Sequence, residues 1–184
     1  MIIDFQIDND INIDEFWEQS DYLSAFELSS ENDRAFILVS AVALEDKIVN
    51  ILETLLPSIN SLKDNKEFTF SFKINLLKSF DLYNLRVVEY LHLVRKIRNE
   101  FAHNLNIADF ENISNNTINH IDQCLKILET KRTCNKVRDK IEVIVNWLFW
   151  ELIALEPYSK KLREIMESRE TVEKLKSVKK EKVL

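Results

Sequence analysis

The chain of 184 residues contains no glycine, and its only prolines are Pro57 and Pro157. Glycine is the residue that most readily takes a positive φ angle, which tight hairpins and phosphate-binding loops require. Its absence argues against P-loop ATPases and Rossmann dinucleotide-binding proteins, whose fingerprints contain glycines. We therefore expect an all-α fold: a compact helical bundle with a long central antiparallel helix pair and a charged C-terminal helix.

The length of the chain is sufficient for one domain with its own hydrophobic core. Pro157 interrupts a pattern of apolar residues at helical spacing, and bases and acids alternate after it. We expect a helical domain over residues 1–157 and a charged helical extension over residues 158–184.

The net charge of −6 is unevenly distributed along the chain. Residues 1–34 contain ten acids and one base, whereas residues 160–184 contain five acids and nine bases. An acidic chain is not attracted to nucleic acid as a whole. Any RNA contact must therefore come from a local patch, either around Arg95, Lys96 and Arg98 or in the basic tail.

The two cysteines, Cys124 and Cys134, do not have the spacing of a metal site and are expected to be thiols. His92 and His103 share a helix face but have no aligned carboxylate, so they form a poor metal site. The N-terminus lacks the basic region of a secretion signal, and no apolar run approaches the roughly 20 residues of a membrane span. We expect a cytoplasmic protein with no metal, no small-molecule cofactor and no membrane segment.

Apolar residues recur at helical spacing in seven segments of the chain. Residues 30–33, Ser-Glu-Asn-Asp, have the form of a capping box at the start of the second segment. Residues 58–67 are polar and predict a loop. Residues 68–72 alternate like a strand, but no second strand offers a partner, so we expect an extended lead-in to a helix. The expected helices cover residues 14–28, 30–56, 72–80, 83–104, 115–128 and 134–155, followed by a solvated helix from residue 159.

Residues 98–103, Arg-Asn-Glu-Phe-Ala-His, end the most clearly amphipathic of these helices. His92, Lys96, Asn99 and His103 lie opposite its apolar face, and Arg98 lies at the edge of that face, with its guanidinium directed outward. Asn99 is four residues before His103, close enough for its amide to orient the imidazole. The apolar face consists of Val87, Tyr90, Leu91, Val94, Ile97 and Phe101.

Arg98 and His103 offer the groups needed to cleave RNA without a metal. A neutral imidazole with a pKa near about 6.5 accepts the proton of the ribose 2′-hydroxyl, and a guanidinium holds the phosphate. One copy of the chain provides half of such a site, and a two-fold homodimer would provide both halves. The alternative is structural: Arg98 pairs with Glu45 or Asp46 of the preceding long helix, and His103 caps a carbonyl at its own helix end.

The motif resembles the Arg-Asn-x-x-x-His motif of HEPN proteins, and the chain is most similar within that group to the mannitol operon repressor family. The similar segments are residues 32–45, 70–77 and 97–103. The resemblance implies a helical bundle that is often dimeric, with metal-independent endoribonuclease activity in many members. It implies Arg98 and His103 as the catalytic pair and Asn99 as the orienting residue. Supporting polar residues would be Glu45, Asp46, Arg95 and Lys96.

These observations lead to three hypotheses for the function. The first is an RNA-binding or metal-independent RNA-cleaving protein, in which His103 is the general acid/base and Arg98 the phosphate clamp. The second is a non-catalytic transcriptional regulator or protein-interaction module, although no helix-turn-helix with a basic recognition helix is visible. The third is an antitoxin-like or immunity-like protein whose acidic N-terminal segment covers a basic partner.

Overall fold

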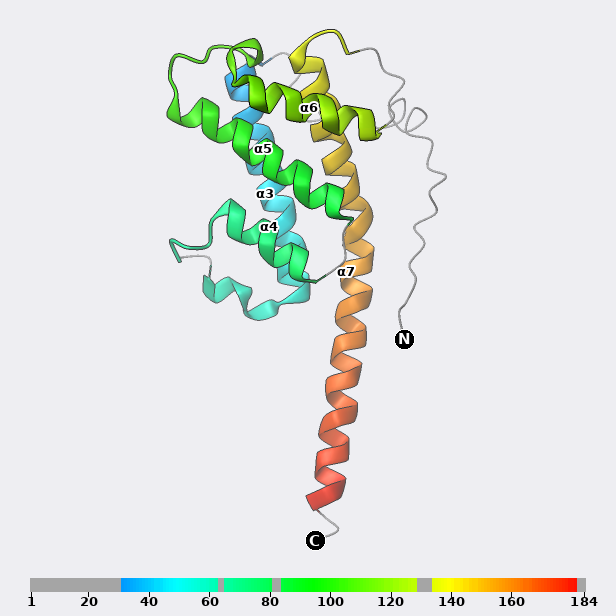
Figure 1. Ribbon diagram of the computed structural model, residues 1–184. Coiled ribbons are helices and arrows are strands. Elements are labelled where there is room, and N and C mark those ends of the chain that lie inside the picture. Colours follow the sequence, from blue (N-terminus) through cyan, green and yellow to red (C-terminus); the bar gives the residue numbers. More distant parts are fainter. Residues whose placement is uncertain (1–30, 63–64, 81–83, 129–133, 182–184) are drawn as a thin grey trace. The chain divides into compact units, whose positions relative to one another are not determined.

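The computed structural model describes residues 31–62, 65–80, 84–128 and 134–181 of the chain (Figure 1). Every regular element in these ranges is helical, which confirms the all-α prediction. The helix expected over residues 14–28 lies outside them. None of the described helices is both long enough and apolar enough to cross a membrane. The elements are α3 (Asp33–Leu55), η2 (Pro57–Leu62), α4 (Phe70–Ser79), α5 (Leu85–His103), η3 (Phe110–Asn112), α6 (Asn115–Leu128) and α7 (Val137–Glu181).

The helices belong to two compact units. In the described residues, unit 1 contains residues 31–40 and 96–147, and unit 2 contains residues 41–95 and 148–181. Helices α3, α5 and α7 each contribute residues to both units. The boundary expected between residues 157 and 158 therefore stays a prediction, as does the antiparallel helix pair.

The ends of α3 and α4 are set by capping side chains. The Asn32 Oδ1 atom accepts a hydrogen bond of 2.9 Å from the Ala35 amide, which makes Asn32 the N-cap of α3. Ser30 of the expected capping box lies outside the described residues. At α4, the Thr69 hydroxyl accepts from the Phe72 amide at 3.3 Å. The helix consequently begins at Phe70, two residues before the predicted start.

The other predicted boundaries differ by a few residues at most, with two exceptions. Helix α6 covers the expected residues 115–128, and α5 begins and ends within two residues of its prediction. The first exception is the segment after α3, where residues 57–62 form a 3₁₀ helix in place of a loop. The second exception is α7.

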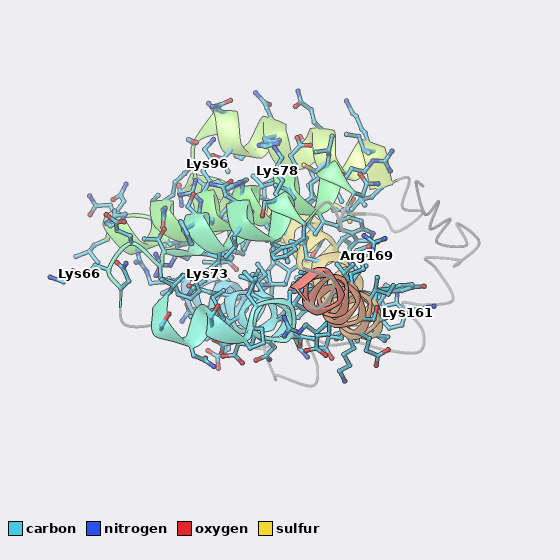
Figure 2. All side chains as sticks on the ribbon, turned by 90° about the horizontal axis from the view of Figure 1, so that it is seen from below. Lys66, Lys73, Lys78, Lys96, Lys161 and Arg169 are labelled. Carbon is cyan, nitrogen blue, oxygen red and sulfur yellow. The ribbon has the colours of Figure 1, made fainter. Side chains whose placement is uncertain are left out.

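The expectation that Pro157 ends a helix is wrong. Helix α7 is 45 residues long, from Val137 to Glu181, and Pro157 lies inside it. Proline in a helix interior costs about 3 kcal/mol, since it lacks an N–H group and its ring crowds the preceding turn. Contacts within unit 2 hold both flanking turns. The Lys47 ammonium lies 3.1 Å from the Glu156 carboxylate, and Arg163 Nη1 donates to the carbonyl of Leu55 at 3.4 Å. Figure 2 views α7 end on, with Lys161 and Arg169 on its later turns.

Unit 1 has an aromatic core directly beneath the Arg98–His103 segment. The ring of Phe110 contacts Phe101 edge to face, with 5.2 Å between the centroids, and contacts Phe36 at 6.0 Å. All three side chains are fully buried. These contacts join the end of α5, the start of α3 and η3, so the core fixes the direction in which α5 ends.

Candidate functional site

The structure confirms the predicted faces of α5. The six predicted apolar residues are at most 1% exposed, whereas Lys96, Arg98 and Asn99 are half-buried and His103 is exposed. The predicted site residues belong to different units: Lys96, Arg98, Asn99 and His103 lie in unit 1, and Glu45, Asp46 and Arg95 lie in unit 2.

Asn99 does not orient His103 as the sequence predicted. Its Oδ1 atom instead accepts a hydrogen bond of 3.0 Å from Nη1 of the neighbouring Arg98. The bond holds one edge of the guanidinium, which leaves the other nitrogens of Arg98 available to a ligand. Among the described residues, His103 makes no hydrogen bond, and its side chain is exposed at the last position of α5.

The structural alternative for Arg98 is not supported in the part of the chain that the structure describes. Arg98 makes no ion pair there, and its only hydrogen bond is the one to Asn99. Glu45 accepts a hydrogen bond of 2.5 Å from the Lys73 ammonium on α4 within unit 2. Asp46 is exposed. Glu45 is therefore a structural partner of Lys73.

Arg98 and His103 do not lie on the same face of α5. Five positions along an α-helix correspond to a rotation of about 140° and a rise of about 7.5 Å. The two side chains therefore leave α5 in different directions.

The C-terminus of α5 is held by Arg34, a residue to which the sequence assigned no role. Its Nη1 donates to the Phe101 carbonyl, and its Nη2 donates to the carbonyls of Asn104 at 3.1 Å and Ile107 at 2.7 Å. The guanidinium also lies 5.7 Å from the centroid of the Phe101 ring. The last carbonyls of a helix have no partner within the helix and carry partial negative charge, which a guanidinium satisfies. Arg34 thereby fixes the turn that carries His103.

A second arginine, Arg138, holds the start of α3 through Asp33. Arg138 Nη1 lies 2.7 Å from Asp33 Oδ1, and Asp33 Oδ2 accepts from the Phe110 amide at 2.8 Å. Arg138 Nε also donates to Glu142 at 2.8 Å. These hydrogen bonds raise the pKa of the Arg138 guanidinium, although burial acts in the opposite direction. The network ties α7 and η3 to the first turn of α3.

Glu100, at a variable position of the motif, connects α5 to α6. Its carboxylate accepts from the Ser114 amide at 2.9 Å, from the Ser114 hydroxyl at 3.1 Å and from the Thr117 hydroxyl at 2.5 Å. Burial tends to raise the pKa of Glu100, but these hydrogen bonds and the nearby Lys96 charge hold it below its usual value. Carboxylates are stabilised at helix N-termini, so Glu100 is a structural cap for α6.

A further sequence expectation concerns the cysteines. Cys124 and Cys134 are thiols that no disulfide joins. On α6, Asp122 accepts a hydrogen bond of 2.6 Å from the Lys140 ammonium, which gives this carboxylate a structural partner.

Comparison of the chain with protein-family models, with curated proteins and with solved structures found no match. The resemblance to HEPN proteins therefore rests on the residues of the motif and of the two segments before it. The geometry of unit 1 is the basis for the proposed role of Arg98 and His103.

Proposed function

We propose that the chain binds RNA and cleaves it without a metal ion, with Arg98 as the phosphate clamp and His103 as the general acid/base. This proposal rests on the exposure of His103 and on the missing ion-pair partner of Arg98 within the part of the chain that the structure describes. His103 is exposed without a hydrogen bond among the described residues, and Arg98 lacks a carboxylate partner there. A buried histidine or arginine with a structural role is normally hydrogen-bonded to protein groups, whereas the exposed His103 and the other nitrogens of Arg98 are open to a ligand.

The surroundings of the pair support a positioned site. Arg34 satisfies the carbonyls at the end of α5, and Glu100 fixes the start of α6, so neither task falls to Arg98 or His103. Asn99 limits the rotation of the Arg98 guanidinium. Catalytic groups are most effective when neighbouring contacts hold them in place.

The proposed mechanism uses the neutral imidazole of His103 to accept the proton of a ribose 2′-hydroxyl. The 2′-oxygen then attacks the adjacent phosphorus, the bond to the 5′-oxygen breaks, and a protonated imidazole returns a proton to that leaving oxygen. The guanidinium of Arg98 stabilises the negative charge that develops on the phosphoryl oxygens. A homodimer would bring the second Arg98 and His103 to the same groove.

The test compares wild type, His103→Ala and Arg98→Ala on single-stranded RNA in the presence of EDTA. We expect each substitution to lower the cleavage rate by about 10²-fold or more, as is typical for the loss of a general acid/base or an oxyanion donor. Arg86→Ala, which removes an exposed arginine from the first turn of the same helix, should leave the rate unchanged. Equal rates in all variants would refute the catalytic role.

A non-catalytic regulator or interaction protein is the second candidate, and one observation favours it. Leu105, two residues after His103, is 86% exposed, so an apolar side chain next to the motif is open to a partner. In this case the wild-type chain leaves RNA intact in EDTA, and Leu105→Ser weakens the binding of a protein partner or of a second copy. Sedimentation of the wild type and Leu105→Ser distinguishes self-association.

A further inference from the structure

Helices α4 and α5 contribute three basic side chains to one part of unit 2. His92 and Arg95 are three positions apart on α5 and therefore lie on one side of it, and Lys78 lies in the last turn of α4. The pKa of His92 is lowered by burial and then by the charges of Arg95 and Lys78. Both charged neighbours that act on His92 are thus cations.

Five half-buried cations of the described residues have a carboxylate partner. Lys47, Lys73, Arg138, Lys140 and Arg163 each lie within 3.1 Å of a carboxylate oxygen. The half-buried Arg95 and the exposed Lys78 make no ion pair in the part of the chain that the structure describes. The Nε atom of Arg95 is buried and has no hydrogen-bond partner. A buried donor without a partner costs about 1–3 kcal/mol, and more when it is charged.

We propose that Lys78, His92 and Arg95 form a binding site for a phosphate group. A phosphate supplies the negative charge and the acceptor oxygens that these side chains lack. The planar guanidinium of Arg95 binds phosphate oxygens through its Nη–H groups, and the ammonium of Lys78 neutralises the remaining charge. The His92 imidazole donates one further hydrogen bond through a ring N–H.

The partner is a phosphate monoester or the phosphodiester of RNA, since both present the same oxygens. The site belongs to unit 2, whereas Arg98 and His103 belong to unit 1. The proposal therefore does not depend on RNA cleavage. If the chain does bind RNA, the site is a second backbone contact that carries no base specificity.

The test follows the His92 imidazole by NMR in the full chain, with His92→Gln to assign its resonances. Inorganic phosphate, uridine monophosphate and a short single-stranded RNA are titrated separately at constant ionic strength, with chloride as the reference. We expect phosphate to shift the His92 resonances and to raise the pKa of His92, because an anion offsets the two neighbouring cations. The ligand that saturates at the lowest concentration identifies the source of the phosphate.

Substitutions then test which groups bind. Lys78→Ala and Arg95→Gln should each weaken phosphate binding by about tenfold or more, since each removes a charged hydrogen bond. Lys66→Ala is the matched control, because Lys66 is also in unit 2 and extends away from the helices in Figure 2. Arg95→Lys keeps the charge but loses the planar pair of Nη donors, and should bind with intermediate affinity.

Two results would overturn the proposal. One is an absence of His92 shifts with all three ligands when the ionic strength is held constant. The other is phosphate binding that Arg95→Gln and Lys66→Ala weaken equally, which indicates general attraction to positive charge. The RNA cleavage assay with His103→Ala is scored separately, so failure of one proposal leaves the other intact.

Discussion

The carboxylate of Glu100 accepts a hydrogen bond of 2.5 Å from the buried hydroxyl of Thr117, seventeen residues later in the chain. The contact joins the end of α5 to the first turn of α6. Residues 98–103 therefore differ in their surroundings, because the half-buried Glu100 is hydrogen-bonded to α6 while His103 is exposed. The motif thus combines a structural residue with two candidates for chemistry.

Replacing Glu100 by Gln should destabilise the chain at neutral pH by about 1 kcal/mol, as expected for hydrogen bonds to a partly exposed charged group. The pKa of Glu100 is lower in the folded chain than its usual value of 4.5. Its contribution is therefore present above that value and is lost as the pH falls through the lowered pKa. Urea unfolding of Glu100→Gln should show a weaker loss of stability below pH 4.5 than wild type. The exposed Glu111, replaced by Gln, serves as the control.

Replacing Arg34 by Ala should destabilise unit 1 by about 1.5–3 kcal/mol, because several carbonyls at the end of α5 lose a charged donor. The amides of residues 104–110 should exchange with deuterium faster than in wild type, since the loop is no longer tied to α3. Arg86→Ala removes an exposed arginine and should change neither quantity. If the exchange of residues 104–110 stays at the wild-type rate, Arg34 does not hold the loop.

Replacing Pro157 by Ala should stabilise the chain, by up to about 3 kcal/mol, because Pro157 lies within a continuous helix and is exposed. Alanine restores the missing N–H donor without filling a buried space. The increase is measured by urea unfolding, with Lys160→Ala as a control at an exposed position on the same helix. A decrease in stability would show that a helix begins at Pro157, where proline is favourable.

Replacing Glu151 by Gln should stabilise the chain at neutral pH. Burial raises the pKa of this carboxyl above its usual value of 4.5, so the folded chain holds the proton more tightly than the unfolded chain. The stabilising contribution of Glu151 is present below that value and is lost as the pH rises through the raised pKa. The difference between wild type and Glu151→Gln should therefore grow between pH 4 and pH 7. Glu164→Gln, at an exposed position of α7, should show no such trend.

Much of the local structure follows from the sequence because the signals are local. The spacing of Val87, Leu91 and Val94 defines one face of a helix, and the structure buries that face fully. Likewise, the absence of glycine removes most sites for tight hairpins. The boundaries of α5 and α6 were predictable within two residues for the same reason.

The sequence by itself thus determined the helical class, the faces of α5 and the position of the Arg98–His103 motif, since each depends on residues close together in the chain. Only the tertiary structure decided which groups contact the side chains around that motif. Arg34 caps α5 from 67 residues away, and Asn99 binds Arg98 in place of His103. The same holds for the helix around Pro157, which is locally unfavourable. Lys47 and the carbonyl of Leu55 contact the helix on either side of this proline. Partners that are distant in the chain leave no periodic pattern in a single sequence.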